Sequence, residues 1–259
     1  MRNFCKYIVL LSLSTLLFSC TTNSTTSFHK DETQSSTTDL DFTQFLALSK
    51  AFAPNSEAAF ADTVEKLKKI PTDWISFDVA ATKMFGEDKV DFSTPSDTLD
   101  LMKKIFIKTN YLEKDLSGIS LKYQNLNAKE MELLKYFFST QNFGFSYPNA
   151  QLTKFNGNQL TIDTNKLVSE EITKFFDDTF AKSDVKTNEV QIRAISKIFE
   201  INYTNILKFD KKIKSIKGNH PWISKKDDYT VLINYKLSDF YSEKYQNANH
   251  DKEVIITTE

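Results

Sequence analysis

The sequence holds few of the residues that build the commonest nucleotide and metal sites. Glycine occurs only five times in 259 residues, and neither a glycine-rich nucleotide fingerprint nor a P-loop is present. The three histidines, His29, His220 and His250, are too scattered for the paired spacing of a helical zinc motif. We therefore expect no cofactor and no such metal site. An oxygen-only calcium or magnesium site stays open, although the sequence has no EF-hand spacing.

Cysteine and arginine are scarce as well. Cysteine occurs twice, at Cys5 and Cys20. If Cys5 leaves with an export signal, the mature chain holds one thiol and cannot form an internal disulfide. Arginine is found at Arg2 and Arg193, which disfavours sites built on paired guanidinium groups. The net charge of −1 becomes −3 once Arg2 and Lys6 are removed, and this balance argues against nucleic-acid binding.

What is present at the start of the chain is typical of export. Arg2 and Lys6 precede an apolar core from Tyr7 to Phe18, which is shorter than the roughly 20 residues that span a bilayer. The core ends in Leu17-Phe18-Ser19-Cys20, which resembles the lipobox of bacterial lipoproteins. The resemblance implies that residues 1–19 are a signal peptide and that Cys20 is lipid-modified.

The rest of the chain is predicted to be a tether followed by one domain. Residues 21–39 are rich in threonine and serine and poor in large apolar side chains, so residues 20–39 are expected to be the lipidated cysteine and a disordered tether. Residues 40–259 are expected to be a mainly helical domain of about seven or eight helices with a small β-hairpin.

The helical expectation comes from apolar residues recurring at three- and four-residue steps. Helices are predicted within residues 42–52, 60–70, 74–85, 96–106, 127–138, 164–180 and 188–217, with Asn127 and Glu130 as a capping box. Asn156-Gly157 predicts the hairpin, through a type I′ turn. Residues 229–240 suit a helix or a strand, and residues 254–258 a short strand or a disordered tail.

No cluster of residues specifies a reaction, so no catalytic residue is assigned. The most site-like segment is the turn containing Gly218, His220, Pro221 and Trp222. One interpretation is a loop that presents a titratable ring and an aromatic anchor to a partner. The other is a helix stop with Trp222 packed on the core.

Three patches resemble the small subunit of membrane-associated flavin-dependent sugar and alcohol dehydrogenases. They are residues 41–52 (DFTQFLALSKAF), residues 133–149 (LLKYFFSTQNFGFSYPN) and residues 218–221 (GNHP). The family usually has a tryptophan-tyrosine pair where this chain has Tyr136-Phe137, and it lacks the long spacing seen here before the last patch. The resemblance implies a non-catalytic partner that helps a flavoprotein to mature or to stay at the membrane.

Taken together, the sequence predicts a lipid-anchored lipoprotein of the bacterial cell envelope, at the outer membrane on its periplasmic or surface face. Its expected partners are the membrane, through the lipid anchor, and another protein, but not nucleic acid. We interpret the domain as a non-enzymatic binding or accessory module. The alternatives are the dehydrogenase subunit, an envelope hydrolase and a carrier of lipids or small molecules.

Overall fold

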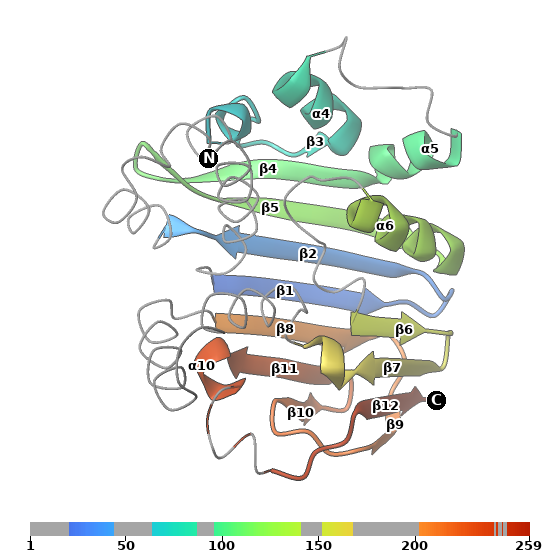
Figure 1. Ribbon diagram of the computed structural model, residues 1–259. Helices are drawn as coiled ribbons and strands as arrows, with labels where there is room; N and C mark the ends of the chain where they lie inside the picture. The colour runs from blue at the N-terminus through green and yellow to red at the C-terminus, as the bar shows by residue number, and fades with distance from the viewer. Residues whose placement is uncertain are drawn as a thin grey trace.

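The computed structural model describes residues 21–43, 64–86, 96–140, 152–167 and 202–259, apart from 241, 243, 244, 246 and 247. Within these residues the protein is mostly β-structure, with an eight-stranded sheet and a four-stranded sheet (Figure 1). The mainly helical prediction was therefore wrong. The described residues contain no helix that is both long enough and apolar enough to cross a membrane.

The large sheet joins segments from both halves of the chain. All of its neighbouring strands pair antiparallel except β1 and β8, which are parallel. In spatial order its strands are β10 (Ile223–Asp227), β11 (Thr230–Lys236), β8 (Asn202–Phe209), β1 (Thr21–Phe28), β2 (Gln34–Asp41), β5 (Asp115–Leu126), β4 (Ile105–Leu112) and β3 (Ile75–Ser76).

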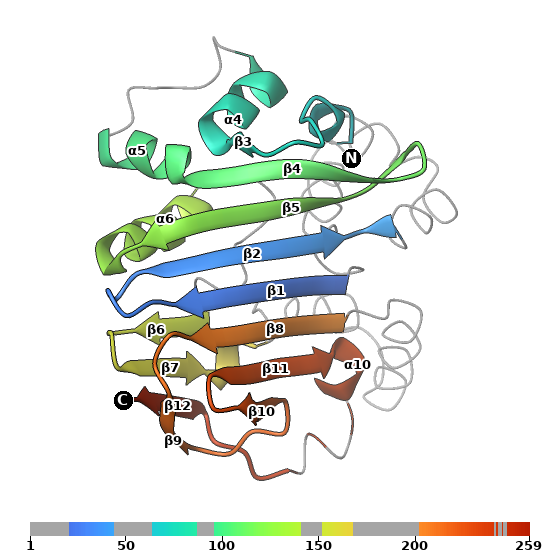
Figure 2. The same ribbon diagram turned by 180° about the vertical axis from the view of Figure 1, so that it is seen from behind.

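The small sheet packs against one face of the large sheet, on the half that holds β8 and β11 (Figures 1 and 2). Its strands, in spatial order, are β6 (Thr153–Phe155), β7 (Gln159–Asp163), β12 (Glu253–Thr258) and β9 (Ile213–Lys217). The helical elements are α4 (Phe77–Phe85), α5 (Ser96–Lys104), α6 (Ala128–Thr140), the short 3₁₀ helix η2 (Thr164–Lys166) and α10 (Leu237–Phe240).

Two apolar cores result from this arrangement. The first contains Leu121 and Ile107 of the large sheet together with Phe77 of α4 and Leu101 of α5. The second lies where the two sheets meet, and its members include Leu207, Ile233, Leu160 and Ile256, all fully buried. The apolar side chains that the sequence supplies thus fill two separate cores, with β1 and β2 between them.

The segment expected to be a tether forms β1 and β2, the two central strands of the large sheet. They pair from Thr21 opposite Asp41 to Phe28 opposite Gln34. Alternate residues of both strands are buried, which is the two-residue period of a strand. Most of the buried side chains carry hydroxyls, and those of Ser24, Thr26, Ser36 and Thr38 are paired; Ser24 Oγ, for example, lies 2.9 Å from Thr38 Oγ1. Because hydrogen bonds offset the cost of burying hydroxyls, a strand can be central without large apolar side chains.

The helix predicted over residues 188–217 is also wrong in its described part. Residues 202–217 form β8 and β9, joined by a turn at residues 210–212. Tyr203, Asn205, Leu207 and Phe209 are buried, in the two-residue alternation of a strand. The apparent helical period arose because Ile206, Phe209 and Ile213 happen to stand three and four residues apart. Residues 188–201 lie outside the described part of the chain.

Several local predictions were confirmed. The backbone N–H of Asn127 donates to Glu130 Oε2 at 2.9 Å, and the N–H of Glu130 donates to Asn127 Oδ1 at 3.0 Å, which is the expected capping box of α6. The predicted hairpin is β6–β7, although only Gly157 of its turn has a positive φ, so the turn is not type I′. Residues 254–258 fall in β12.

Candidate functional site

The turn at residues 218–222 follows a strand, β9, rather than a helix. His220 and Trp222 are buried, at 3% and 8% exposure, while Gly218 and Pro221 are exposed. The Trp222 ring stacks on Tyr245 with a centroid distance of 4.3 Å and on Tyr235 with one of 4.5 Å. Trp222 therefore packs into the second core. Partner binding by this turn stays a prediction, and it would have to use Gly218 and Pro221.

His220 is held neutral inside this aromatic cluster. Burial and, to a smaller extent, the nearby His250 lower the pKa of His220 to about 4. The backbone N–H of Trp222 donates to His220 Nδ1 at 3.3 Å, so the proton of the neutral ring is on Nε2, which lies 3.3 Å from Tyr245 Oη. One ring nitrogen thus holds the turn itself together, and the other links the turn to Tyr245.

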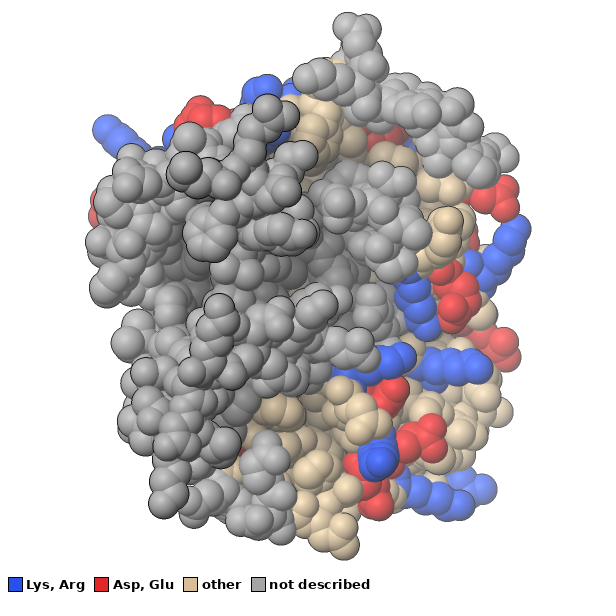
Figure 3. Space-filling model, in the orientation of Figure 1, with Lys and Arg blue, Asp and Glu red and all other residues tan. Residues whose placement is uncertain are grey.

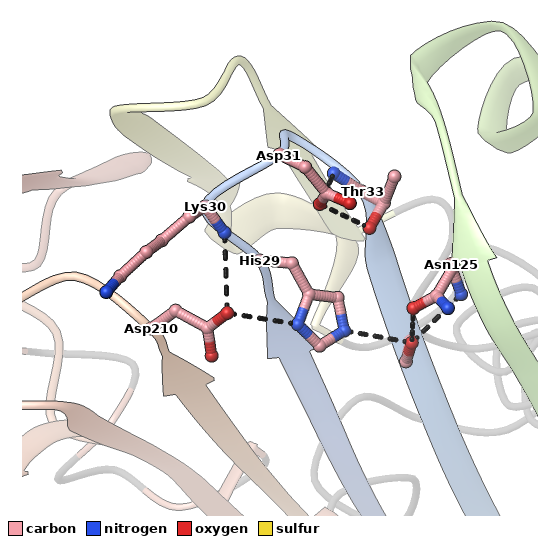
Figure 4. Close-up of polar contacts among 7 residues, drawn as sticks. His29, Lys30, Asp31, Thr33, Asn125 and Asp210 are labelled. Atoms are coloured by element: carbon pink, nitrogen blue, oxygen red, sulfur yellow. Dashed lines mark hydrogen bonds and ion pairs between the residues drawn. The ribbon is translucent and has the colours of Figure 1, made fainter.

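Within the described residues, Asp210, His29 and Ser35 form a hydrogen-bonded row of groups that occur together in hydrolase active sites; Figure 4 labels His29 and Asp210. His29 Nδ1 lies 3.3 Å from Asp210 Oδ2, and His29 Nε2 lies 3.0 Å from Ser35 Oγ. The order of groups is that of a serine nucleophile, a histidine base and an orienting carboxylate. The parallel pairing of β1 with β8 produces it, because Asp210 follows Phe209 just as His29 follows Phe28.

The hydrogen bonds of Ser35 nevertheless argue for a structural role. The Asn125 backbone N–H donates to Ser35 Oγ at 2.9 Å, and the Ser35 hydroxyl donates to Asn125 Oδ1 at 3.1 Å. The Ser35 hydroxyl proton therefore points to the side-chain oxygen of Asn125 and not to His29. The Asn125 backbone N–H donates to the Ser35 oxygen, so it is not free to bind a substrate. The hydrogen bonds of Asp210, His29 and Ser35 therefore link the β1–β2 turn to the ends of β5 and β8.

The outer face of the large sheet, turned away from the small sheet, is polar. No described helix or strand covers it (Figure 2). Near β3, Lys108 Nζ and Lys122 Nζ lie 5.2 Å and 4.6 Å from the centroid of the Trp74 ring, within the range of cation–π attraction. Beside them, Ser120 Oγ donates to Asp39 Oδ1 at 2.5 Å. This face can offer polar and aromatic contacts to a binding partner.

The two ends of the large sheet differ in character, and we name one after Thr21, the first residue of β1, and the other after His29, which follows β1. At the Thr21 end, Thr21, Asp41, Gly118 and Asn110 form one row across β1, β2, β5 and β4. The β4–β5 hairpin continues beyond this row, with Leu112 opposite Asp115. The tip carries Leu112, which is 62% exposed, and Tyr111, which is 38% exposed.

At the opposite end, the His29 end, charged turns meet one another. Asp228, in the β10–β11 turn, pairs with Lys212 at 3.1 Å and with Lys225 at 2.7 Å. On the molecular face of Figure 3, basic and acidic side chains of the described residues lie next to one another, without a large area of one sign. Within the described ranges, no group of three or more His, Cys, Asp or Glu residues is arranged to hold a metal ion.

Comparisons with known proteins give one structural likeness. No family model and no curated protein match the chain. The folded domain of the Mycobacterium tuberculosis LppM protein, determined by NMR, aligns with 93% of this chain and 90% of its own at 10% identity and a TM-score of 0.36. A TM-score below 0.5 does not show a shared fold.

Proposed function

We propose that this protein is a lipid-anchored protein of the bacterial cell envelope whose β-rich domain acts as a non-enzymatic binding module. The observation that carries the proposal is the sequence Leu17-Phe18-Ser19-Cys20 at the end of an apolar core, followed at once by a structured strand. A signal peptide that ended at residue 19 would leave all of β1 intact. The lipobox-like segment and the start of the domain therefore meet without overlap.

The short distance between Cys20 and β1 determines how a lipid anchor would hold the domain. Consecutive Cα atoms are about 3.8 Å apart, and Thr21 is the first residue of β1. A lipid on Cys20 would thus be attached one residue away from the end of a central strand of the large sheet. Such a domain would be held against the membrane by its Thr21 end, whereas the expected tether would have let it move freely.

Binding rather than catalysis is supported by the described chemistry. The Asp210–His29–Ser35 row is occupied by bonds within the protein, and His220 is buried. The open outer face of the large sheet offers a surface for a protein partner. The dehydrogenase-subunit alternative gains no support here, because no family model and no curated protein match the chain.

The anchor can be tested with radioactive palmitate in cells that express the full chain. Wild type should be labelled and should sediment with membranes, because two or more acyl chains hold a protein stably on a bilayer. Cys20→Ala should lose both the label and the sedimentation. Cys5→Ala is the matched control, since Cys5 belongs to the predicted signal peptide, and it should behave as wild type. A Cys20→Ala chain that kept its label would refute the proposal.

The binding role needs a separate test. A photo-crosslinking residue at Asn23, an exposed position on the outer face, should capture a reproducible partner in cells. The matched control is Tyr136 on α6, which is 66% exposed but belongs to the opposite side of the sheet. Equal capture at both positions, or capture at neither together with turnover of a small substrate, would contradict a binding surface on this face.

A further inference from the structure

We infer that the β4–β5 hairpin tip, defined as residues Tyr111 to Asp115, contacts the phospholipid headgroup region when the protein is anchored. The inference rests on the proposed lipid at Cys20 and adds a second membrane contact to it. It also fixes how the domain is oriented: the strands of the large sheet stand on the bilayer with the Thr21 end down and the His29 end away from the membrane.

The strand register places the tip beside the anchor. Thr21 and Asn110 share one row across four strands, so they are separated by three strand spacings, roughly 14 Å. Leu112 lies two residues beyond Asn110, roughly 7 Å further along the strand direction. Figures 1 and 2 both show this hairpin extending past the start of β1. A bilayer that holds Cys20 at its surface therefore meets the tip.

The side chains at the tip suit an interface between water and lipid. Leu112 is the most exposed large aliphatic side chain among those whose exposure is described, and Tyr111 stands next to it. Tyrosine favours the headgroup level of membranes, where its ring is shielded and its hydroxyl stays wet. Glu113, Lys114 and Asp115 complete the tip with charges of both signs. Because the tip has no strong net charge, we expect the contact to depend on the apolar side chains and to persist in high salt.

The opposite end provides a matched control. Tyr229 lies in the β10–β11 turn and is 50% exposed, close to the exposure of Leu112. Its carbonyl accepts a hydrogen bond from the N–H of Phe209, which pairs with Phe28 at the far end of β1. Seven residue steps along β1 separate this level from Thr21, roughly 23 Å. A side chain at position 229 should therefore remain in water.

The test uses the acylated full chain reconstituted into phosphatidylcholine vesicles that contain no other protein. In Leu112→Cys the new thiol is the one that can react with a polarity-sensitive dye, because the Cys20 sulfur carries lipid in the proposed mature protein. We expect the dye to emit at shorter wavelength than in the water-exposed Tyr229→Cys protein. Quenching by a lipid with a quencher near its headgroup should likewise be strong at 112 and weak at 229, with or without high salt.

The outcomes separate the two proposals. If mass spectrometry shows acylation but the dye at 112 remains in water, the hairpin contact is wrong and the anchor stands. If the purified chain carries no lipid on Cys20, the proposed function fails and this inference fails with it. Equal shielding at 112 and 229 would show that the domain lies on its side, which also contradicts the proposed orientation.

Discussion

Two strand pairs of the large sheet, β1–β2 and β8–β11, are built on the same backbone pattern with different chemistry. The buried face of β8 and β11 carries Leu207, Phe209, Val231 and Ile233. The buried face of β1 and β2 carries mainly hydroxyls, which bond to one another across the strands. One pair is held by apolar burial and the other by a paired hydroxyl network. A segment with the composition of a linker can therefore occupy the centre of a sheet.

Deleting β1 and β2 should have the largest effect on the stability of the domain. Removing residues 21–41 would separate β8 from β5 and expose the edges of both halves of the sheet. Since a domain of this size is stable by only about 5–15 kcal/mol, we expect the cooperative unfolding transition to disappear. Circular dichroism during thermal melting would measure it. A chain that starts at Thr21 is the control and should show a normal cooperative transition. A normal transition after deletion of residues 21–41 would instead support the prediction that this segment is a tether.

The contribution of apolar burial in the β8–β11 pair can be measured by truncating one of its core side chains. Leu207 is fully buried between the two sheets, so Leu207→Ala should lower the free energy of unfolding by about 2–5 kcal/mol. Denaturant titration would give the value. Leu232→Ala is the control, because Leu232 faces the opposite side of the sheet and is only half-buried, and its loss should be clearly smaller.

Acid should weaken the core next to β11 through His220. Its pKa is about 4 in the folded protein and about 6.5 when unfolded, so the unfolded state binds more protons between these values. Stability from neutral His220 is therefore complete above pH 6.5 and declines as the pH falls to 4, by about 2–3 kcal/mol in total. His220→Gln should flatten the curve of unfolding free energy in this window. An unchanged slope in the variant would contradict a buried neutral ring.

A single hydroxyl of β2 should matter less than a core leucine. Thr38→Val keeps the shape but removes the oxygen that lies 2.9 Å from Ser24 Oγ, and we expect a loss of about 1 kcal/mol. Thr37→Val is the matched control on the outer face, where a β-branched apolar residue should cost almost nothing. If the two variants were equally stable, the paired hydroxyls would not be what holds β1 and β2 together.

The smallest effect on stability is expected from lengthening the junction with the anchor. A ten-residue Gly/Ser insert between Cys20 and Thr21 leaves every strand pair intact, so the unfolding free energy should stay within about 0.5 kcal/mol of wild type. The insert should still abolish the lipid-dependent quenching of a dye at position 112, because the flexible segment releases the Thr21 end from the membrane. Quenching that survived the insert would mean that the tip binds lipid without help from the anchor.

Local signals in the sequence were reliable where a few neighbouring residues decide the structure. The Asn127–Glu130 capping box and the β6–β7 hairpin around Gly157 are of this kind. The strands β1 and β2 were missed because their buried positions carry threonine and serine, whose partners stand ten or more residues away. In β8, Asn205 at a buried position hid the alternation that Leu207 and Phe209 would otherwise have shown.

Candidate site residues were harder to predict, because topology brings them together. His29 and Asp210 are 181 residues apart, and only the parallel pairing of β1 with β8 makes them neighbours. The turn at residues 218–222 was singled out for its chemistry, but whether its rings are exposed depends on Tyr235 and Tyr245, which no local pattern reveals. Cys20 lies outside the described residues, so its lipidation remains a prediction from the lipobox-like sequence alone.

The threonine- and serine-rich segment is folded into β1 and β2, so that the proposed anchor site adjoins the sheet directly. Amide hydrogen exchange of the full chain measures this residue by residue. We predict that Thr22 to Phe28 exchange as slowly as the amides of β8, because β1 is bonded on both sides by β8 and β2. Exchange of these amides at the rate of an unstructured peptide, while β8 stays protected, would contradict the account.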